Sequence, residues 1–557
     1  MKGKTSIALA QCKNEIEFMQ KQEECSNLLW IPTNIETLLY FKRNNLSYIN
    51  PIDYLNNKYH EECLIESKKL ISALKPRMNV DGIYHVRFLN IIRKYFFSTF
   101  YILKIITELN KKNKIDNIVL SGWDSYDFNS TKNNYFVSRI TYHLLKNKFN
   151  IKLLKKLELK LYKNKITFKI PKNLPDNFII FSNLGYNFKK ILFYKFFSNQ
   201  KILIFDFNKV SKMKQIILKF LGVNFVNIKR EKNFLLDTNI KINNFQDISY
   251  KYEDYDFSDL FNLRTKQICT EIDELKDIEN AINRTLSENK PKAIYLNMTR
   301  GANDFLIKFS KKFNIPCYLM PHGTLSKGNS VYEQMYNDII STEITSKDCI
   351  NCVQTKIAEE FFKNKKEYKN VITGNLIFTS RKRSRGAKGI LYAVTNRDFI
   401  NNLPYGVESF FEFESNLRLL NDLAKKYKLE IIVKLHPMIS HSINDLKNLF
   451  KYLVFSNNQL SKIIDKVLIT VSFSSTVIED SIVSRVPVIL FDRWKRYKHC
   501  KAQENPNMKG SAIYYVNDYK NLLYAINTIR NSNKDINFNE YLYDSQINQD
   551  NFKKIDN

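Results

Sequence analysis

The stretch VLITVSFSSTVIEDSIVSRVPVILF (467–491) decides the fold class. An apolar run at 467–471 leads into a polar turn at 472–476, and a helical pattern then extends to about residue 484. A second apolar run follows at 486–491. A buried strand, a helix and another buried strand form a βαβ unit, whose two strands are parallel. The sequence therefore predicts a parallel sheet that is covered by helices.

The same pattern recurs along the chain on both sides of this unit. A basic, apolar-poor stretch, SRKRSRGAK (380–388), interrupts it once and is typical of a linker. We therefore expect an α/β protein with two Rossmann-like domains facing a cleft, at 1–378 and 389–557, with a linker at 379–388. The other expected strands are 28–31, 118–121, 178–182, 201–207, 224–228, 293–297, 317–320, 390–394, 430–435 and 512–516.

Composition excludes several classes of protein. With 557 residues, 44% of them hydrophobic and 13% aromatic, the chain is not a disordered basic tail. The net charge of +31 has two explanations: lysine-favouring A/T-rich codons, or a basic surface for an anionic membrane, donor or glycan. The segment 143–172 concentrates this charge, with ten Lys and one Glu within 146–172. It could contact a membrane, but a solvated helix and hairpin is the favoured interpretation.

Targeting and metal signals are weak. The start of the chain has no apolar leader of adequate length, and no window of ~19 residues is free of charge. Cys349 and Cys352 form a CxxC without a second pair, so no zinc site and no other metal is expected. We expect structural thiols in a cytoplasmic protein.

The polar turn at 472–476 carries the first candidate chemistry. Ser474, Ser475 and Thr476 would place hydroxyl and backbone N–H groups at the start of a helix, which suits a phosphate. Glu479, one turn later, could accept the hydroxyls of a ribose. The alternatives are ordinary N-caps for the three hydroxyl residues and a surface acid for Glu479.

Two histidines also follow expected strands. His436 comes directly after the strand at 430–435 and could bind a donor phosphate. His322 lies between Pro321 and Gly323, and it is placed to act as a general base opposite the phosphate site. Gly323 would let the backbone pass close to a ligand. The alternative for both histidines is a structural role.

Together these motifs resemble a known family. The elements PHGTLSKG (321–328), ILYAVTNRD (390–398), VKLHP (433–437) and SFSSTVIED (472–480) resemble GT-B transferases that build bacterial surface polymers. The pattern is similar to that of CDP-glycerol glycerophosphotransferases, and capsule sialyl- and Kdo-type transferases share part of it. ITGNLI (372–377) is similar to a segment of the non-hydrolysing UDP-N-acetylglucosamine 2-epimerases, which have the same fold.

The resemblance implies roles for particular residues. His322 would be the base or anchor the acceptor, His436 with Ser474 and Ser475 would hold the donor phosphate, and Arg397 would clamp it. Asp492 and Arg493, after the last strand of the opening stretch, would also face the cleft. The whole expected set is, on the donor side, Thr395, Asn396, Arg397, Ser474, Ser475, Thr476, Glu479 and Arg493, and on the acceptor side, Asp124, Arg300, Gly323 and Thr324.

The expected function is transfer of a sugar or polyol-phosphate group to a capsule, lipopolysaccharide or teichoic-acid-like polymer. The donor would be nucleotide-activated, with CDP or CMP favoured over UDP, and no further cofactor or metal would be needed. The acceptor would be a glycan or lipid-linked glycan, and the protein could sit on the inner face of the cytoplasmic membrane. The alternatives are a nucleotide-sugar epimerase of the same fold and a basic membrane-associated binding protein without catalysis. No nucleic-acid-binding motif is found.

Overall fold

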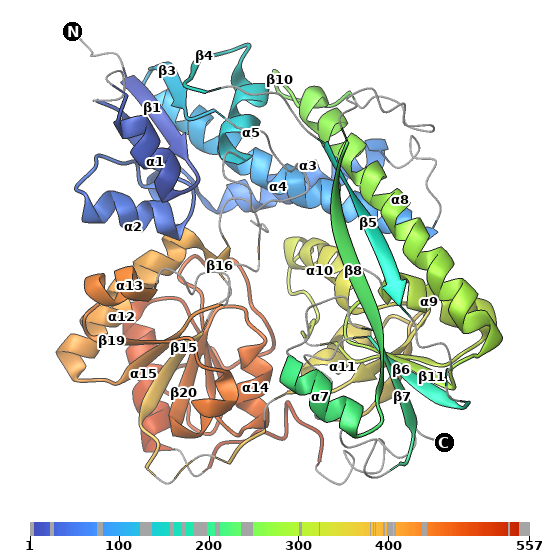
Figure 1. The fold of residues 1–557 in the computed structure, drawn as a ribbon. Coiled ribbons are helices and arrows are strands. Elements are labelled where there is room, and N and C mark those ends of the chain that lie inside the picture. Colours follow the sequence, from blue (N-terminus) through green and yellow to red (C-terminus); the bar gives the residue numbers. More distant parts are fainter. Residues whose placement is uncertain are drawn as a thin grey trace.

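The described part of the chain forms three large, mainly parallel sheets with helices packed around them, and two small ladders (Figure 1). The protein is represented by a computed structural model. The described residues are 5–22, 27–74, 82–122, 136–155, 161–169, 174, 176–182, 198–205, 212–235, 249–299, 303–321, 323–378, 380–382, 384, 386–393, 396–397, 405, 408–436, 443–532 and 535–544.

The N-terminal sheet has four parallel strands in the order β2-β1-β3-β4. Its strands are β1 (Thr5–Ala10), β2 (Leu29–Pro32), β3 (Ile115–Leu120) and β4 (Asn150–Leu153), and its helices are α1 (Lys13–Gln20), α2 (Ile35–Arg43), α3 (Asn57–Leu74), α4 (Gly82–Lys112) and α5 (Phe136–Leu145). Helix α2 begins where the sequence calls for a cap, because Asn34 accepts from Thr37 N and Thr37 Oγ1 accepts from Asn34 N.

The second sheet has eight strands in the order β14-β13-β12-β11-β6-β7-β8-β5. Only the edge pair β5–β8 is antiparallel. The strands are β5 (Leu161–Lys169), β6 (Phe178–Phe181), β7 (Lys201–Phe205), β8 (Asn224–Leu235), β11 (Ala293–Leu296), β12 (Cys317–Leu319), β13 (Ile350–Val353) and β14 (Lys369–Ile372). The helices are α7 (Lys212–Phe220), α8 (Ser258–Glu288), α9 (Asn303–Phe313), α10 (Val331–Ile344) and α11 (Lys356–Phe362), and a small ladder joins β9 (Lys251–Tyr252) to β10 (Tyr255–Asp256).

The third sheet has six parallel strands in the order β19-β18-β15-β20-β21-β22. The strands are β15 (Gly389–Ala393), β18 (Ile431–Lys434), β19 (Leu453–Ser456), β20 (Val467–Ser472), β21 (Val488–Phe491) and β22 (Ile513–Val516). The helices are α12 (Phe410–Tyr427), α13 (Ile443–Leu449), α14 (Val477–Val483) and α15 (Tyr519–Asn531), and a short ladder pairs β16 (Asn396–Arg397) with β17 (Glu408–Ser409).

The α/β class with parallel sheets is confirmed, and the quoted 467–491 stretch forms β20, α14 and β21. The expected linker at 379–388 falls between β14 and β15, so the eight- and six-stranded sheets lie on either side of it. Within 1–378, the described strands form a four-stranded and an eight-stranded sheet besides the β9–β10 ladder, a division that the sequence did not predict. The reason is that strand and helix patterns do not reveal which strands pair. The domain boundaries themselves stay a prediction.

The N-terminal unit packs against the helices of the six-stranded sheet. Lys42 of α2 pairs with Glu414 of α12, and Tyr101 of α4 stacks on Phe411 with ring centroids 6.2 Å apart. An exposed ion pair, Arg43–Asp445 at 2.8 Å, lies nearby. The N-terminal part of the chain therefore contacts two of the helices that pack around the C-terminal sheet.

The middle of helix α4 is buried: Phe96, Phe97 and Phe100 lie in the main hydrophobic core. Among the described helices, none has an apolar run long enough to cross a bilayer. Cys349 and Cys352 are buried thiols, and no disulfide joins them.

Candidate functional site

Three strand ends of the six-stranded sheet meet at one edge. Strand β15 pairs with β18 on one side and with β20 on the other, so roughly 10 Å separates the axes of β18 and β20. His436 follows β18 by two residues and is half-buried. Ser474 follows β20 by two residues. His436 and Ser474 therefore follow strands that are separated only by β15, and both their juxtaposition and their roles stay predictions.

The loop between β20 and α14, which we call the serine loop (472–476), presents hydroxyl groups. Ser472 is buried and donates to Ala393 O of β15 at 2.6 Å, which fixes the start of the loop. Ser474 and Ser475 are half-buried and Thr476 is exposed. Ser475 Oγ accepts from Val477 N at 3.3 Å, whereas the Ser474 hydroxyl has no hydrogen-bond partner in the described part of the chain. Because α14 has only seven residues, the hydroxyl groups matter more here than the helix dipole.

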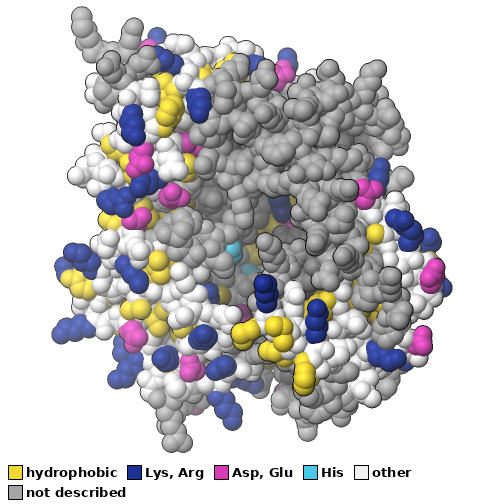
Figure 2. All heavy atoms as spheres, in the orientation of Figure 1, with side chains coloured by type: hydrophobic (Ala, Val, Ile, Leu, Met, Phe, Trp, Pro, Cys, Tyr) yellow, Lys and Arg dark blue, Asp and Glu magenta, His cyan; other side chains and the backbone are white. Residues whose placement is uncertain are grey.

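A loop from the eight-stranded sheet reaches the serine loop. Gly323 follows β12, and a Cβ placed on it would lie 3.7 Å from Thr476 Cγ2 and 3.8 Å from Ile344 Cδ1. Both distances are ordinary van der Waals contacts, so the described protein atoms leave room for an alanine there. Figure 2 shows a hollow near the middle of the drawn face, with histidine side chains visible inside it. The two larger sheets therefore meet at the serine loop.

Helix α10 is tied to the C-terminal part on another side. Glu333 Oε1 accepts from Lys498 N at 2.9 Å, and Asn329 Nδ2 donates to Lys498 O at 3.3 Å. Tyr336 and Tyr497 pack edge to face with ring centroids 5.8 Å apart. These contacts join the region of α10 to the loop that follows β21.

Gln354 connects the Gly323 loop to the segment that leads into the linker. It follows β13 and is buried, and its Nε2 donates to Pro321 O at 2.9 Å. Its Oε1 accepts from Leu376 N and Ile377 N, each at 3.1 Å. Sequence reasoning missed Gln354, although a polar residue directly after the strand at 350–353 was a usable signal.

Glu479 and Arg493 are both held by other side chains. Glu479 is fully buried and its Oε1 lies 3.0 Å from His499 Nε2, while its Oε2 has no hydrogen-bond partner in the described part of the chain. Arg493 Nη1 donates to Ser415 Oγ at 2.9 Å and to Asn416 Oδ1 at 3.3 Å. Glu479 is thus no surface acid, and its contact with a ribose stays a prediction.

A buried acidic network lies behind these groups. Glu408 accepts from Tyr392 Oη at 2.9 Å and from Asn416 Nδ2. Burial, with the charge of Glu412 nearby, raises the pKa of Glu408 to about 8. Glu412 in turn accepts from Arg496 Nη2 at 2.7 Å. Because β17 pairs Glu408 with Asn396 and Ser409 with Arg397, this network supports the backbone of the expected clamp.

Asp492 follows β21, and Lys434 is the last residue of β18. Asp492 is buried, which raises its pKa, and it accepts from Arg496 N at 2.5 Å and Tyr497 N at 2.7 Å. It therefore shapes its own loop instead of facing a cleft as expected. Lys434, at the end of β18, is half-buried, and burial lowers its pKa while Asp480 opposes that shift. Sequence reasoning did not single out Lys434, although it lies in the VKLHP element.

Several expected residues cannot be placed. His322, Thr395, Asp124 and Arg300 lie outside the described residues, although Pro321 and Gly323 flank His322 on both sides. Asn396 and Arg397 are described only as the backbone of β16, and Thr324 is half-buried. In the described ranges, no three His, Cys, Asp or Glu side chains gather as metal ligands.

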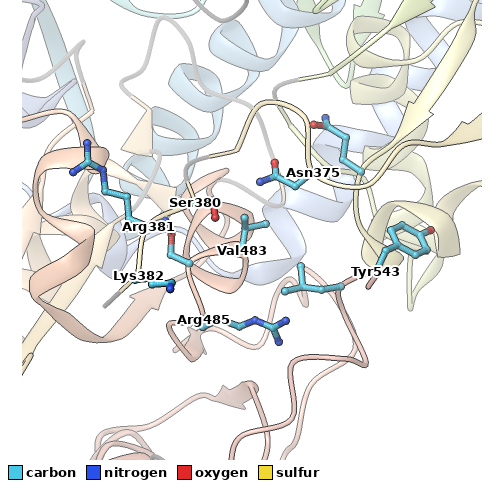
Figure 3. A pocket seen from close by; sticks show the side chains of 10 residues that line it. Asn375, Ser380, Arg381, Lys382, Val483, Arg485 and Tyr543 are labelled. Carbon is cyan, nitrogen blue, oxygen red and sulfur yellow. Dashed lines mark hydrogen bonds between the residues drawn. The ribbon is translucent and has the colours of Figure 1, made fainter. Parts of the chain in front are cut away.

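A separate pocket of about 370 Å³ lies at the linker (Figure 3). Gln354 and Asn375 line it from the eight-stranded side, Ser380 and Arg381 from the linker, and Arg485 from the end of α14. The linker is attached to the C-terminal part, since Arg381 N donates to Ser484 Oγ at 3.3 Å. Gln354 lines this pocket and also donates to Pro321 O, so the same side chain contacts both the pocket at the linker and the loop that carries Gly323.

No protein-family model matches the sequence, and no curated protein matches it. Solved structures do show a distant likeness. A UDP-GlcNAc 2-epimerase from Neisseria meningitidis bound to UDP-GlcNAc is 13% identical, with a TM-score of 0.39, over 69% of this chain and 99% of that chain. The epimerase from Methanocaldococcus jannaschii is 12% identical, with a TM-score of 0.38, over 69% and 100%. A variant of the wall teichoic acid polymerase TagF is 13% identical, with a TM-score of 0.32, over 68% and 90%. Likenesses this distant leave the function to be inferred from the site itself.

Proposed function

We propose that this chain is a GT-B-type transferase that moves a sugar or polyol-phosphate group from a nucleotide-activated donor to a bacterial surface glycan. The observation that carries the proposal is the meeting of two loops from different sheets, with Gly323 against Thr476 of the serine loop. A group-transfer enzyme needs donor and acceptor held in one geometry, and a site between two sheets provides a face for each.

The donor is assigned to the six-stranded side. Ser474 and Ser475 would donate to a donor phosphate, and His436 on the neighbouring strand end would do the same. Arg397 would clamp the phosphate with its guanidinium, and Lys434 adds a cation at the same sheet edge. A CDP- or CMP-activated donor is preferred over a UDP donor because the motifs resemble the glycerophosphotransferases.

The acceptor is assigned to the eight-stranded side. His322 would accept the proton of the attacking hydroxyl, which forms a new bond to the transferred carbon or phosphorus. The bond from that atom to the donor phosphate breaks, and the nucleotide leaves with the electron pair on its phosphate oxygen. Thr324, with Asp124 and Arg300, would orient the acceptor. Charge stabilisation by His436 and Arg397 replaces a metal in this scheme.

The proposal extends to the setting of the reaction. A lipid-linked or polymeric surface glycan is made at the cytoplasmic membrane, so the enzyme would work at its inner, anionic face. Nucleic acid is not among the proposed partners. The epimerase alternative would need groups for proton abstraction at the sugar, and the nearest acid, Glu479, is buried beside His499.

A panel of CMP, CDP, UMP, UDP and GDP in a thermal-shift measurement tests the donor assignment. A ligand at ~100 times its dissociation constant stabilises the folded state by about 2.7 kcal/mol, and the resulting melting shift is measurable. We expect a shift with CDP or CMP that is lost in Ser475→Ala. Incubation of the corresponding nucleotide sugars without acceptor then separates the activities, because an epimerase would convert the sugar while a transferase would not. No shift with any nucleotide would contradict the proposal.

A further inference from the structure

Helix α7 turns its apolar side outward. Met213, Ile216, Ile217 and Phe220 have the spacing of one helix face, and their side chains are 73%, 65%, 45% and 92% exposed. A surface helix normally packs such a stripe against the core. Here the stripe faces solvent, which marks it as a contact surface for something outside the chain.

The helix is anchored from its opposite side. Leu218 is fully buried in the apolar cluster that includes Ile202 and Ile204 of β7, and Leu221 packs against the same cluster. The outward stripe is therefore a consequence of a well-packed helix. Figure 2 shows an apolar patch flanked by basic side chains in the lower middle of the view, where Figure 1 places α7.

The charge around the stripe indicates what it contacts. Lys212 and Lys219 are exposed, and neither forms an ion pair in the described part of the chain. Helix α7 itself contains three Lys and no acidic residue. Lysines beside an exposed apolar face suit a surface that offers both anionic groups and hydrocarbon. A lipid bilayer with anionic headgroups offers both, whereas a protein partner would need a matching acidic rim.

We propose that α7 docks the protein on an anionic lipid bilayer, with the apolar stripe at the headgroup–acyl boundary and the lysines on lipid phosphates. The helix is too short to span a bilayer, so the protein lies on the membrane surface at this point. This inference deepens the membrane setting of the proposed function by naming the helix that contacts the lipid, and it does not rest on the transfer chemistry, because α7 contributes no residue to the candidate site.

Flotation of the full chain with vesicles of phosphatidylglycerol and phosphatidylcholine tests it. We expect the double variant I216E/F220E to bind at least ~10-fold more weakly than the parent, since two side chains no longer enter the apolar layer. The matched control is V454E/M508E, which adds the same charge at two exposed apolar residues elsewhere and should bind like the parent. At about 1 M NaCl, where the Debye length is ~3 Å, the parent should keep part of its binding.

A second variant removes the apolar stripe without adding charge. I216S/F220S should weaken vesicle binding in the same direction, with unchanged circular dichroism and unchanged nucleotide binding. Equal binding of this variant and the parent would mean that charge alone holds the protein to lipid, and would overturn the proposal. Sedimentation of the parent as a dimer that the variant dissociates would also overturn it, because a second copy of the chain would then cover α7.

Discussion

The six-stranded and eight-stranded sheets differ in where they place charged groups. Around the six-stranded sheet, the Glu412–Arg496 pair is almost completely buried, beside the buried Glu408. Around the eight-stranded sheet, the described ion pairs are at the surface, as in Lys308–Glu279 and Lys311–Asp348, where each lysine is exposed. We infer that the two sheets have different roles. One side holds polar groups in a fixed arrangement for a small donor, and the other presents loops and an outward-facing helix to larger partners.

The largest expected effect lies on the eight-stranded side of the site. His322→Ala should lower the transfer rate about 100- to 10,000-fold and leave nucleotide binding intact, because a general base acts on the acceptor hydroxyl. His143→Ala, in α5, serves as the histidine control. Rates, melting temperature and nucleotide affinity are measured on each variant. A folded His322→Ala protein with parental activity would show that His322 is not the general base.

The next prediction concerns stability on the six-stranded side. Arg496→Met should lower the free energy of unfolding by about 3–5 kcal/mol, because Glu412 would remain buried without its cation. Lys311→Met, at the exposed pair of the other sheet, should change it by about 0–1 kcal/mol. Denaturant titrations of both variants give the two values. Similar values would remove the contrast between the sheets.

The pattern of apolar runs, together with the rule that ligands bind at the carboxyl ends of parallel strands, explains which parts of the fold could be predicted from the sequence. Apolar runs followed by polar turns predicted β15, β18 and β20, and these three strands are neighbours in one sheet, so His436 and Ser474 follow strands at the same sheet edge. Two strands of the N-terminal sheet, β2 and β3, were predicted, but their pairing in a separate sheet was not, since pairing between strands such as β1 and β3, about a hundred residues apart, leaves no local signal. Edge strand β5 lies in the segment 143–172, for which a helix and a hairpin were favoured, but its antiparallel partner is β8, which is distant in sequence.

Prediction of the site residues from the sequence was limited in the same way. The serine loop was predictable because its hydroxyl residues are consecutive, whereas the partners of Gln354 are Pro321 on one side and Leu376 and Ile377 on the other. Glu408 was not singled out, because its role depends on burial next to Glu412. Long-range contacts and desolvation are properties of the folded chain, and no short motif records them.

Gln354 offers a smaller effect that connects the two sides. Gln354→Leu would leave the carbonyl of Pro321 and two N–H groups without their partner, at about 1–3 kcal/mol per buried group. We expect a lower melting temperature and also a lower kcat, since the Gly323 loop would lose its position. Asn351→Leu is the control. The side-chain amide of Asn351 is also buried and donates to backbone carbonyl groups, but Asn351 lies within β13 and not at the end of the strand that leads to Gln354. If both variants lose only stability, Gln354 is not a positioning residue.

The smallest effect is expected for Glu408 at acid pH, and the effect grows as the pH rises. Its pKa of about 8 in the folded protein lies above the ordinary value of 4.5, so the folded state holds a proton that the unfolded state releases. The stability that this group contributes is complete below pH 4.5 and is lost as the pH rises through 8. Glu408→Gln should change stability little below pH 4.5 and flatten its decline between pH 4.5 and 8. Unfolding curves across that range measure it, and an unchanged slope would contradict the buried, protonated Glu408.

The central claim is that the edge formed by β18, β15 and β20 binds the phosphate of a nucleotide-activated donor. Calorimetric titration of CDP into the parent, His436→Ala, Ser475→Ala and a Ser456→Ala control at the neighbouring strand β19 tests it most directly. Each loss of a hydrogen bond to a charged phosphate is worth about 1.5–3 kcal/mol, so the first two variants should bind roughly 10- to 150-fold more weakly and the control unchanged. Parental affinity in both His436→Ala and Ser475→Ala, with the fold intact, would contradict the assignment.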